Sequence, residues 1–427
     1  MLAALLLAVA QAPAPDRAAV TPSSAVVIVL DDVASADLAL YGGPVETPYL
    51  AQLAARGVLF TNAYGMATCA PARRSLLTGH WWTGESGDKC GPPAPEWPTA
   101  AEVFLPEALG IPAAIFGKWH LGGAPGVGVG CAPLAHGFQH WIAGLPSNVS
   151  QCGGKNYTDW VRASSAACGL TPSSLYAPEE IATAFRTNWA ATTGPRFAVI
   201  GAPLPHGPFH VPPANLLPAN YPQPIVTRRQ RYEAMIRAQD TLLGQMLAGV
   251  NLEDTLVVVV ADNGTPTQVA PDPAKAKTTV YERGVRVPLI FAGGPITGAG
   301  RASDALISIV DIYATTLDAL GASIPSSSGG YPVASLSFLP VLKQTGTGPR
   351  VQALVGTGHG RPGAERGAIG AGRKLRTVDQ DGDGVYETEL LFDLQADPAE
   401  TVDVSAQPVY ASDLAALRAF IAAEALP

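Results

Sequence analysis

Short apolar runs separated by helix-forming stretches are the feature that most constrains the fold of this chain. Residues 25–30 contain no polar side chain, which is typical of a strand buried on both faces of a parallel sheet. Residues 48–54 are predicted to be a helix, because Thr47 suits an N-cap and Pro48 suits the first helical turn. Further strands are predicted at 113–116, 197–200, 255–261 and 288–291, and further helices at 100–109, 178–191, 228–247 and 309–320. This alternation predicts an α/β sandwich around a mostly parallel sheet.

The last part of the chain predicts a smaller unit with antiparallel strands and a closing helix. Residues 374–378 and 389–394 read as a hairpin, and residues 411–425 as a helix. The connecting turn contains Asp379, Asp381 and Asp383 at alternate positions, which is similar to the start of a calcium-binding loop. The twelfth position of such a loop would be a leucine where the loop requires Glu. We therefore interpret this segment as a polar hairpin turn.

The composition excludes some classes of partner and indicates the compartment. The formal charge of -8, without a basic stripe, argues against a nucleic-acid-binding protein. Residues 1–10 are apolar and end in Ala-Val-Ala, as in a signal peptide, and they are about half the length of a membrane span. We therefore predict no transmembrane segment and export to the periplasm or the extracellular space.

The five cysteines agree with export. Four of them fall in one Gly- and Pro-rich region, as two disulfides in an oxidising compartment would: Cys90, Cys131, Cys152 and Cys168. Four cysteines allow three pairings. We expect Cys90 to pair with Cys131, and Cys152 with Cys168. Cys69 is the odd residue and remains free for another use.

Polar residues follow three of the predicted strands directly. They are Asp31 and Asp32 after the first strand, Lys118 and His120 after the second, and Asp262 and Asn263 after the strand at 255–261. Chemistry in parallel sheets gathers at the carboxyl ends of the strands, so these residues are candidates for one site. A set of carboxylate and amide oxygens favours calcium or magnesium over zinc.

Several motifs occur in one order along the chain, and together they resemble the formylglycine-dependent sulfatases, arylsulfatase-like members of the alkaline phosphatase superfamily. The resemblance runs from about residue 25 to 405. Besides the two aspartates after the first strand, its motifs are Cys69-x-Pro71-x-Arg73, Gly117-Lys118-Trp119-His120-Leu121-Gly122, His206-x-Pro208, Asp262-Asn263-Gly264, Lys277 with Tyr281-Glu282-Arg283-Gly284-Val285-Arg286-Val287-Pro288, and the closing Leu391-Phe392-Asp393-Leu394 with Asp397-Pro398-Ala399-Glu400.

The resemblance implies a fold, a reaction and a division of roles. The fold would be alkaline phosphatase-like, with a signal peptide and linker at 1–22, a catalytic sulfatase domain at 23–345 and a C-terminal subdomain at 346–427. The reaction would be hydrolysis of a small sulfate ester, aryl or carbohydrate, after a formylglycine-generating enzyme has oxidised Cys69 to an aldehyde. Calcium, or alternatively magnesium, would be bound by Asp31, Asp32, Cys69, Asp262 and Asn263.

The same resemblance assigns the catalytic residues. Arg73 and Lys118 would stabilise the ionised hydroxyl of the aldehyde hydrate, and His120 would take a proton from its second hydroxyl. His206 and Lys277 would hold the sulfate oxygens, one of them helping to protonate the leaving alcohol. Two alternatives stay open: a phosphonate monoester hydrolase or phosphodiesterase on the same scaffold, and a non-catalytic glycan-binding homologue.

Three features depart from the motifs or stand beside them. Arg283 occupies a position where the family often has glycine, so it either faces solvent or adds positive charge near the site. His210 follows His206 by four residues and is a candidate for lining the pocket. Trp81 and Trp82 fit a stacking wall for substrate, but two buried aromatic residues are the preferred interpretation.

Overall fold

The computed structural model describes residues 21–82, 90, 101–123, 127–166, 168–357 and 362–424. The predicted signal peptide therefore lies almost entirely outside the described residues. The dominant element is a ten-stranded sheet in the order β11-β2-β10-β9-β1-β8-β4-β5-β6-β7. Its bounds are β1 Ser24–Leu30, β2 Gly57–Phe60, β4 Ala113–Lys118, β5 His140–Leu145, β6 Trp160–Ser164, β7 Gly169–Ser173, β8 Phe197–Gly201, β9 Thr255–Ala261, β10 Leu289–Ala292 and β11 Arg301–Ser303.

The centre of this sheet is parallel, as predicted. Strands β9, β1, β8, β4 and β5 run in one direction. Strand β1 lies in the middle and every one of its residues is buried, which explains its uninterrupted apolar sequence. The predicted strand at 288–291 is β10, which runs antiparallel to both of its neighbours. The sheet is therefore mixed, with a parallel core.

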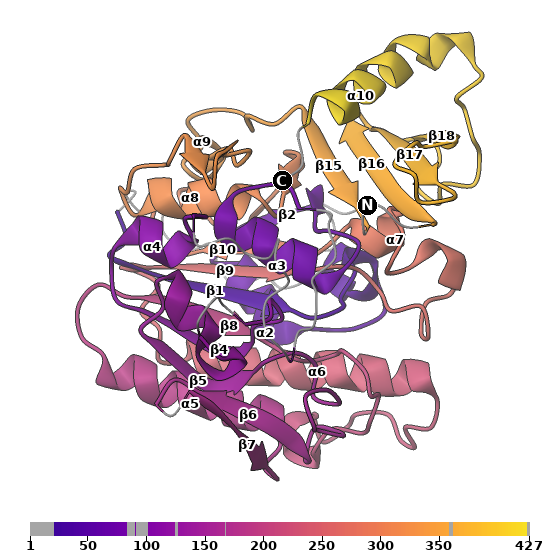
Figure 1. Cartoon of the computed structure of the whole chain (residues 1–427). Helices are drawn as coiled ribbons and strands as arrows, with labels where there is room; N and C mark the ends of the chain where they lie inside the picture. Colours follow the sequence, from indigo (N-terminus) through magenta and orange to yellow (C-terminus); the bar gives the residue numbers. More distant parts are fainter. Residues whose placement is uncertain are drawn as a thin grey trace.

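Helices cover both faces of the sheet and make a three-layer α/β/α sandwich (Figure 1). One layer contains α3 (Cys69–Thr78), α4 (Leu105–Leu109) and α8 (Asp311–Ala319), with α8 in contact with both of the others. The opposite layer contains α2 (Pro48–Ala54), α5 (Ala177–Ala191) and α6 (Arg228–Leu247). No helix in the described ranges has both the length and the apolar character that crossing a membrane requires.

The helix expected at 100–109 is shorter in the structure than predicted, and α4 begins only at Leu105. Pro106 explains the difference, because proline is tolerated in the first helical turn but not in the interior. The backbone N–H of Phe104 donates to the carboxylate of Glu107 at 2.7 Å and closes the start of the helix. The segment before Phe104 is therefore not helical where it is described.

The disulfide pairing predicted from the sequence is wrong. The bonds join Cys90 to Cys152 and Cys131 to Cys168. Cys131 lies in the 3-10 segment η4 (Val129–His136), and the backbone of η4 at Gly130 packs against the carbonyl of Cys168. This contact between η4 and the start of β7 decides the pairing, because a disulfide requires Cα atoms within about 7 Å.

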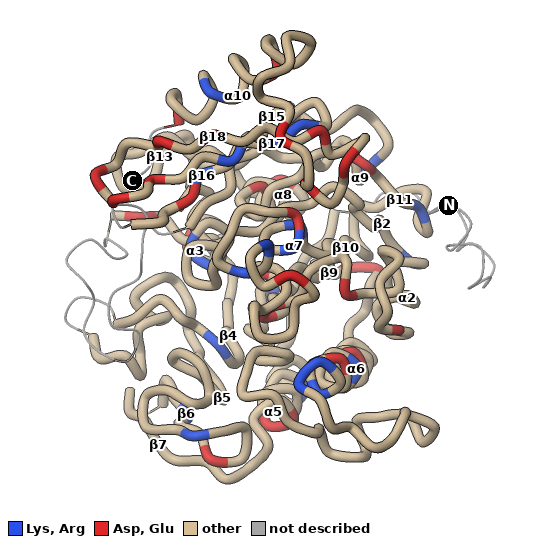
Figure 2. The backbone as a smooth tube through the Cα atoms, turned by 90° about the vertical axis from the view of Figure 1, so that its right-hand side faces the viewer, with Lys and Arg blue, Asp and Glu red and all other residues tan. Residues whose placement is uncertain are grey.

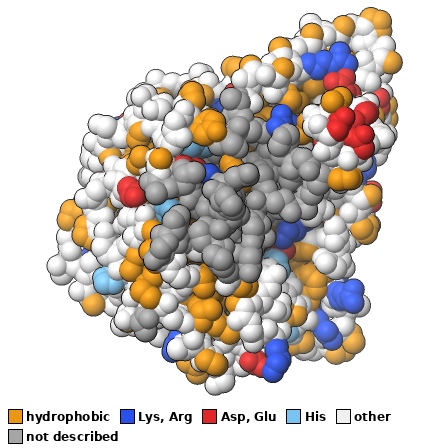
Figure 3. Space-filling model, viewed as in Figure 1, with side chains coloured by type: hydrophobic (Ala, Val, Ile, Leu, Met, Phe, Trp, Pro, Cys, Tyr) orange, Lys and Arg blue, Asp and Glu red, His pale blue; other side chains and the backbone are white. Residues whose placement is uncertain are grey.

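A small antiparallel sheet, the C-terminal sheet, follows the main one. It consists of β15 (Gln352–Gly356), β16 (Ala364–Gly370), β17 (Arg373–Asp379) and β18 (Thr388–Asp393), and α10 (Ala411–Ala423) packs on it. Acidic side chains gather over this sheet in Figure 3, and the acidic turn at 379–387 joins β17 to β18. The predicted small antiparallel sheet with a helix is confirmed. The boundary at residue 345 stays a prediction.

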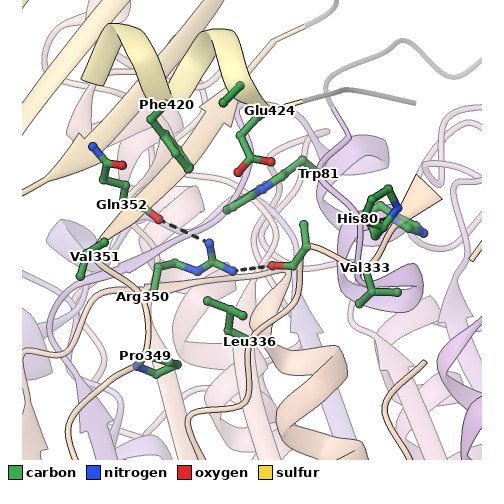
Figure 4. A pocket seen from close by; sticks show the side chains of 13 residues that line it. His80, Trp81, Val333, Leu336, Pro349, Arg350, Val351, Gln352, Phe420 and Glu424 are labelled. Atoms are coloured by element: carbon green, nitrogen blue, oxygen red, sulfur yellow. Dashed lines mark hydrogen bonds between the residues drawn. The ribbon is translucent and has the colours of Figure 1, made fainter. Parts of the chain in front are cut away.

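Arg350 ties the C-terminal sheet to the main layers. Its guanidinium bonds the carboxylate of Asp311 in α8, with Nε at 2.7 Å from Oδ2, and it also donates to the carbonyl oxygens of Ala334 at 2.8 Å and Gln352 at 3.4 Å. Figure 4 shows this guanidinium at the floor of a cleft between α10 and the residues that follow α3. The cleft has a volume of about 480 Å³. Arg350 therefore joins α8, the segment at Ala334 and the start of β15.

We expect acid to destabilise the fold through His136. Its buried ring stacks on Phe104, with centroids 4.1 Å apart, and on Trp119 at 5.9 Å. Burial, helped by the charge of Arg74, lowers the pKa of His136 from 6.5 to about 4. The neutral ring is thus favoured in the folded state. The contribution of this neutral ring to the free energy of unfolding is complete above pH 6.5. It decreases by about 3 kcal/mol as the pH falls toward 4.

Chemical unfolding of the wild type and of His136→Phe between pH 7 and pH 4 tests this expectation. The difference in unfolding free energy between the two should change by about 3 kcal/mol in favour of the variant as the pH falls. His140→Gln, at an exposed position of β5, is the matched control and should follow the wild type. A parallel pH response of the wild type and His136→Phe would contradict the expectation.

Candidate active site

Cys69 lies where the charged residues of the sheet edge converge. It is the first residue of α3 and is 4% exposed. Its Sγ lies 3.4 Å from Oδ1 of Asp31, 3.7 Å from Oδ1 of Asp32 and 3.1 Å from Nζ of Lys277. Burial, followed by the charge of Asp262, raises the pKa of the thiol. The side chain of residue 69 is therefore the common neighbour of two carboxylates and an ammonium.

The two pairs of polar residues at the ends of β1 and β9 meet because these strands are aligned. Leu30 is opposite Ala261 in the parallel register, so both chains leave the sheet at the same level. The backbone N–H of Asp32 donates to Oδ1 of Asp262 at 3.2 Å, and Nδ2 of Asn263 donates to Oδ1 of Asp32 at 2.8 Å. The structure thus brings all four residues together at the carboxyl edge of the sheet.

Each of the three carboxylates has a cationic partner. Lys118 Nζ lies 2.5 Å from Oδ2 of Asp31, and Lys277 Nζ lies 2.5 Å from Oδ1 of Asp32. The guanidinium of Arg73, from α3, lies 2.9 Å from Oδ2 of Asp262. Three positive and three negative charges therefore balance in the protein alone, and a bound divalent cation would leave a surplus of two positive charges.

The pKa values of the carboxyl groups follow from this pairing. Burial by itself raises the pKa of Asp31 and Asp32, but the charges of Lys118 and Lys277 respectively outweigh it and hold both values below the ordinary range. Asp262 differs, because burial and the neighbouring charge of Asp31 outweigh Arg73 and raise its pKa to about 6. Burial alone would lower the pKa of Lys277, but Asp32 raises it well above its ordinary value.

His206 reaches the same carboxylates from the loop after β8. Its Nε2 lies 3.8 Å from Oδ2 of Asp32, and its Nδ1 lies 2.8 Å from the carbonyl of Gly207. Burial lowers the pKa of this imidazole. The hydroxyl of Tyr157 stabilises this loop by donating to the carbonyl oxygens of Pro203 at 2.7 Å and His206 at 2.5 Å.

His120 is buried two residues beyond Lys118, at the end of β4. It has a left-handed backbone with φ of 64°, and its N–H donates to the carbonyl of Pro146 at 3.0 Å. A non-glycine residue in this conformation is strained, and such strain is common at functional sites. The proposed proton transfer at the ring of His120 stays a prediction.

The carboxylate and amide oxygens of the site fit a hard divalent cation. Asp31, Asp32, Cys69 and His206 each offer a ligand atom within 4.8 Å of the others. Oδ1 of Asn263 is buried and accepts no hydrogen bond from the described residues, and a buried carbonyl oxygen of this kind suits a calcium or magnesium ligand. Asp262 also accepts a bond from Arg73 at its Oδ2 and bonds from backbone N–H groups at its Oδ1, which leaves a lone pair on Oδ2 for an ion.

Sequence reasoning missed residues that support the site from the side of α6. The hydroxyl of Tyr232 donates to the carbonyl of Asp32 at 2.9 Å and to the carboxylate of Asp37 at 2.7 Å. Asp37 also accepts from Thr265 at 2.6 Å. Tyr232 is one of several large residues on the buried face of its helix, so the sequence offers no signal that separates it from the core. Tyr157 lies in a turn, and it was missed as well.

The remaining candidates have structural partners. Arg283 bonds the carboxylate of Asp37 at 3.2 Å, so it neither points freely into solvent nor adds an unpaired charge. Tyr176 and the carbonyl of Pro208 bond the two ring nitrogens of His210 at 2.9 and 3.2 Å. The tryptophans that follow α3 are 2% and 7% exposed, as expected for buried aromatic residues: Trp81 and Trp82.

Two solved structures that resemble this fold are a phosphonate monoester hydrolase and a protein in complex with a sulfated glucosamine. A phosphonate monoester hydrolase of Agrobacterium radiobacter superposes with a TM-score of 0.68 at 20% identity, covering 93% of this chain and 96% of the other. A protein in complex with its substrate D-glucosamine-2-N,6-O-disulfate superposes with a TM-score of 0.72 at 19% identity, covering 94% and 97%. At these identities the likeness establishes the fold.

Comparison of sequences identifies the family of the chain as well as its fold. The chain is 29% identical over 366 residues to N-acetylgalactosamine-6-sulfatase of Homo sapiens, covering 76% of this chain and 66% of that enzyme, about two thirds of its length. It is 28% identical over 453 residues to arylsulfatase A of Homo sapiens, covering 94% and 86%. The family model described as Sulfatase matches residues 23–322, which include every residue of the site. The chain therefore belongs to the sulfatase family.

Proposed function

We propose that this protein hydrolyses sulfate esters, with a formylglycine made from Cys69 as its nucleophile and a calcium ion as its cofactor. The observation that carries the proposal is the position of Cys69. It is the free cysteine among the described residues, and its Sγ lies within 3.7 Å of Asp31, Asp32 and Lys277. An oxygen of a modified residue 69 would occupy the position of this sulfur, beside the carboxylates and the ammonium.

The modification supplies what the thiol lacks. The hydrate of the aldehyde would offer one hydroxyl whose oxygen attacks sulfur. Its second hydroxyl would then lose a proton and become the carbonyl oxygen again, as the bond from carbon to the sulfated oxygen breaks and sulfate leaves. It also replaces a soft sulfur by oxygen among ligands that suit a hard cation. Arg73 and Lys118, which pair with Asp262 and Asp31, would stabilise the ionised hydroxyl, while His120 would accept the proton of the other hydroxyl.

The calcium ion would be held by Asp31, Asp32, Asp262 and Asn263 together with residue 69, with magnesium as the alternative. When bound, the ion supplies positive charge for the oxygens of the sulfate group. Its two charges would give a site that is otherwise balanced a net charge of +2, or of +1 once the hydroxyl of the hydrate is ionised. Such a site favours an anionic ester over a neutral one. Lys277 and His206 would bind the sulfate oxygens from the open side.

The substrate class follows from the same charges and from the relatives. The names of the human relatives refer to N-acetylgalactosamine 6-sulfate and aryl sulfates, and a structural neighbour is in complex with a sulfated glucosamine. We propose a small carbohydrate or aryl sulfate as the substrate. The protein would be exported and would depend on a formylglycine-generating enzyme for its activity.

Parallel assays separate this proposal from its main alternative. Sulfate monoesters, phosphodiesters and phosphonate monoesters each carry one negative charge, so the charge of the site does not distinguish them. We expect kcat/KM for an aryl sulfate to exceed that for the matching aryl phosphonate and aryl phosphodiester by roughly tenfold or more. The same aryl group in all three substrates is the control for leaving-group reactivity.

The opposite ranking would contradict the sulfatase proposal and favour the phosphonate hydrolase. Absence of turnover for all three aryl esters and for a panel of sulfated sugars, in protein that carries the aldehyde and calcium, would favour the non-catalytic glycan-binding homologue. Binding of sulfated sugars without hydrolysis would then be measured by calorimetry.

A further inference from the structure

The segment that carries Lys277, residues 275–282, lies against the C-terminal sheet. Figure 2 shows α7 (Glu282–Val285), which directly follows this segment, between that sheet and the central strands. The backbone N–H of Val280 donates to the carboxylate of Glu365 in β16 at 2.9 Å. The backbone N–H of Glu282 donates to the carboxylate of Glu400 at 2.7 Å. Two side chains beyond residue 345 therefore bind the backbone next to a residue of the active site.

The side chain of Lys275 fixes the other end of the segment. Its Nζ donates to the carbonyl oxygens of Ala399 at 2.8 Å and Glu400 at 2.6 Å. On the opposite side, the N–H of Lys277 donates to the carbonyl of Thr265, and the N–H of Thr278 to that of Ala67, each at 2.9 Å. The segment is thus held between the main domain on one side and the C-terminal residues on the other.

Glu400 is the centre of these contacts. It is 4% exposed, and its backbone is left-handed with φ of 55°, which is strained for a residue other than glycine. Lys374 of β17 is fully buried and joins the carboxylates of Glu400 at 3.0 Å and Glu282 at 2.6 Å. Burial alone would lower the pKa of Lys374, but these two carboxylates raise it. The strained backbone of Glu400 and its buried ion pair with Lys374 indicate that this part of the chain adopts one well-defined conformation.

We propose that Glu400 is a positioning residue for Lys277. Its carboxylate and its carbonyl hold the 275–282 segment so that the ammonium of Lys277 lies 3.1 Å from Sγ of Cys69. The proposal rests on the function proposed above, because Lys277 acts there on the sulfate. It also gives a role to the closing Asp397-Pro398-Ala399-Glu400 motif, which makes no direct contact with the site among the described residues.

Glu400→Gln is the first test. The glutamine has nearly the same shape, but it loses the charge that faces Lys374 and one oxygen acceptor. A displacement of about 1 Å at a catalytic group can reduce the rate about 100-fold, so we expect kcat/KM to fall roughly 10- to 100-fold. The decisive measurement is the same substitution in a Lys277→Ala background, where it should cause little further loss. Independent, multiplying losses in the double variant would overturn the proposal.

A matched control separates positioning from general weakening of the C-terminal sheet. Asp393→Asn removes the ion pair with Arg373 at 2.8 Å in the same sheet. None of the hydrogen bonds found for Asp393 in the described ranges reaches residues 275–282. We expect this variant to lose stability while keeping kcat/KM within about threefold of the wild type. An equal loss of kcat/KM in both variants would overturn the proposal.

Amide hydrogen exchange gives a readout that does not require activity. The peptide that contains residues 275–286 should exchange at least about tenfold faster in Glu400→Gln than in the wild type, and at the wild-type rate in Asp393→Asn. If the Glu400 variant does not fold, Lys275→Ala, at a half-buried position, removes two bonds of the same segment and should give the same pattern. An unchanged exchange rate in this peptide overturns the positioning role. A wild type that hydrolyses no ester instead overturns the proposed function and leaves this measurement valid.

Discussion

Replacing Cys69 with alanine is expected to reduce kcat/KM for a sulfate ester on the order of 100,000-fold while leaving the fold intact. The loss is large because the substitution removes the atom from which the nucleophile is made, and the surrounding charges supply only binding and electrostatic stabilisation. The fold should survive because residue 69 is a small side chain at the start of α3. The measurement is steady-state kinetics, with thermal unfolding of the same samples as the check on folding.

Cys69→Ser is the matched control for the chemistry of the residue. A serine places a hydroxyl near the position of the sulfur but lacks the aldehyde and its second hydroxyl, so we expect it to be nearly as inactive as alanine. In wild-type protein from its native host, the peptide that contains residue 69 should be lighter than the unmodified peptide by about 18 Da, because CH2SH is replaced by CHO. Full activity in protein with an unmodified thiol would contradict the proposed mechanism.

Removal of divalent cations is expected to lower kcat by at least about 1,000-fold, and added calcium should restore it. Without the ion, the three carboxylates of the site are neutralised by Arg73, Lys118 and Lys277. The protein then offers no surplus positive charge to the developing charge on the sulfate oxygens. The measurement is turnover after dialysis against a chelator, followed by titration with calcium and, separately, with magnesium.

Asn263→Ala tests the location of the ion. Its Oδ1 is buried without a hydrogen-bond donor among the described residues, so its loss should raise the calcium concentration for half-maximal activity roughly 10- to 100-fold. Asn251→Ala, at an exposed position before β9, is a control that should leave this concentration unchanged. Activity that persists after complete removal of divalent cations would contradict the assignment of a catalytic metal.

The sequence allowed the strands and their chemistry to be predicted together. The uninterrupted apolar run at 25–30 and the run at 255–261 indicated buried parallel strands, and the aspartates that follow them indicated a site at one edge. The structure places Asp32 within hydrogen-bonding distance of Asp262 and Asn263 there, and Asp31 beside them on Cys69. This worked because residues that follow buried parallel strands leave the sheet at the same edge, whatever surrounds them.

Local rules explain the helix that was predicted too long. The apolar content of 100–109 suggested one continuous helix, but the single proline at 106 decided where the helix begins. The sequence contained this information, because a proline confined to the first helical turn would have placed the start of the helix at residue 105. The disulfides are different, because no local rule selects one pairing of four cysteines from three.

The sequence by itself determined which candidate residues gather around residue 69, because they follow buried strands or stand in motifs whose order along the chain is itself specific. Only the tertiary structure decided what supports them: the pairing of Cys131 with Cys168, the bond from Tyr232 to the backbone of Asp32, and the contact of Glu400 with the segment of Lys277. The physical reason is distance along the chain. Each of these contacts forms because two separate elements pack side by side. A local pattern of residues does not show which distant elements will be neighbours in space.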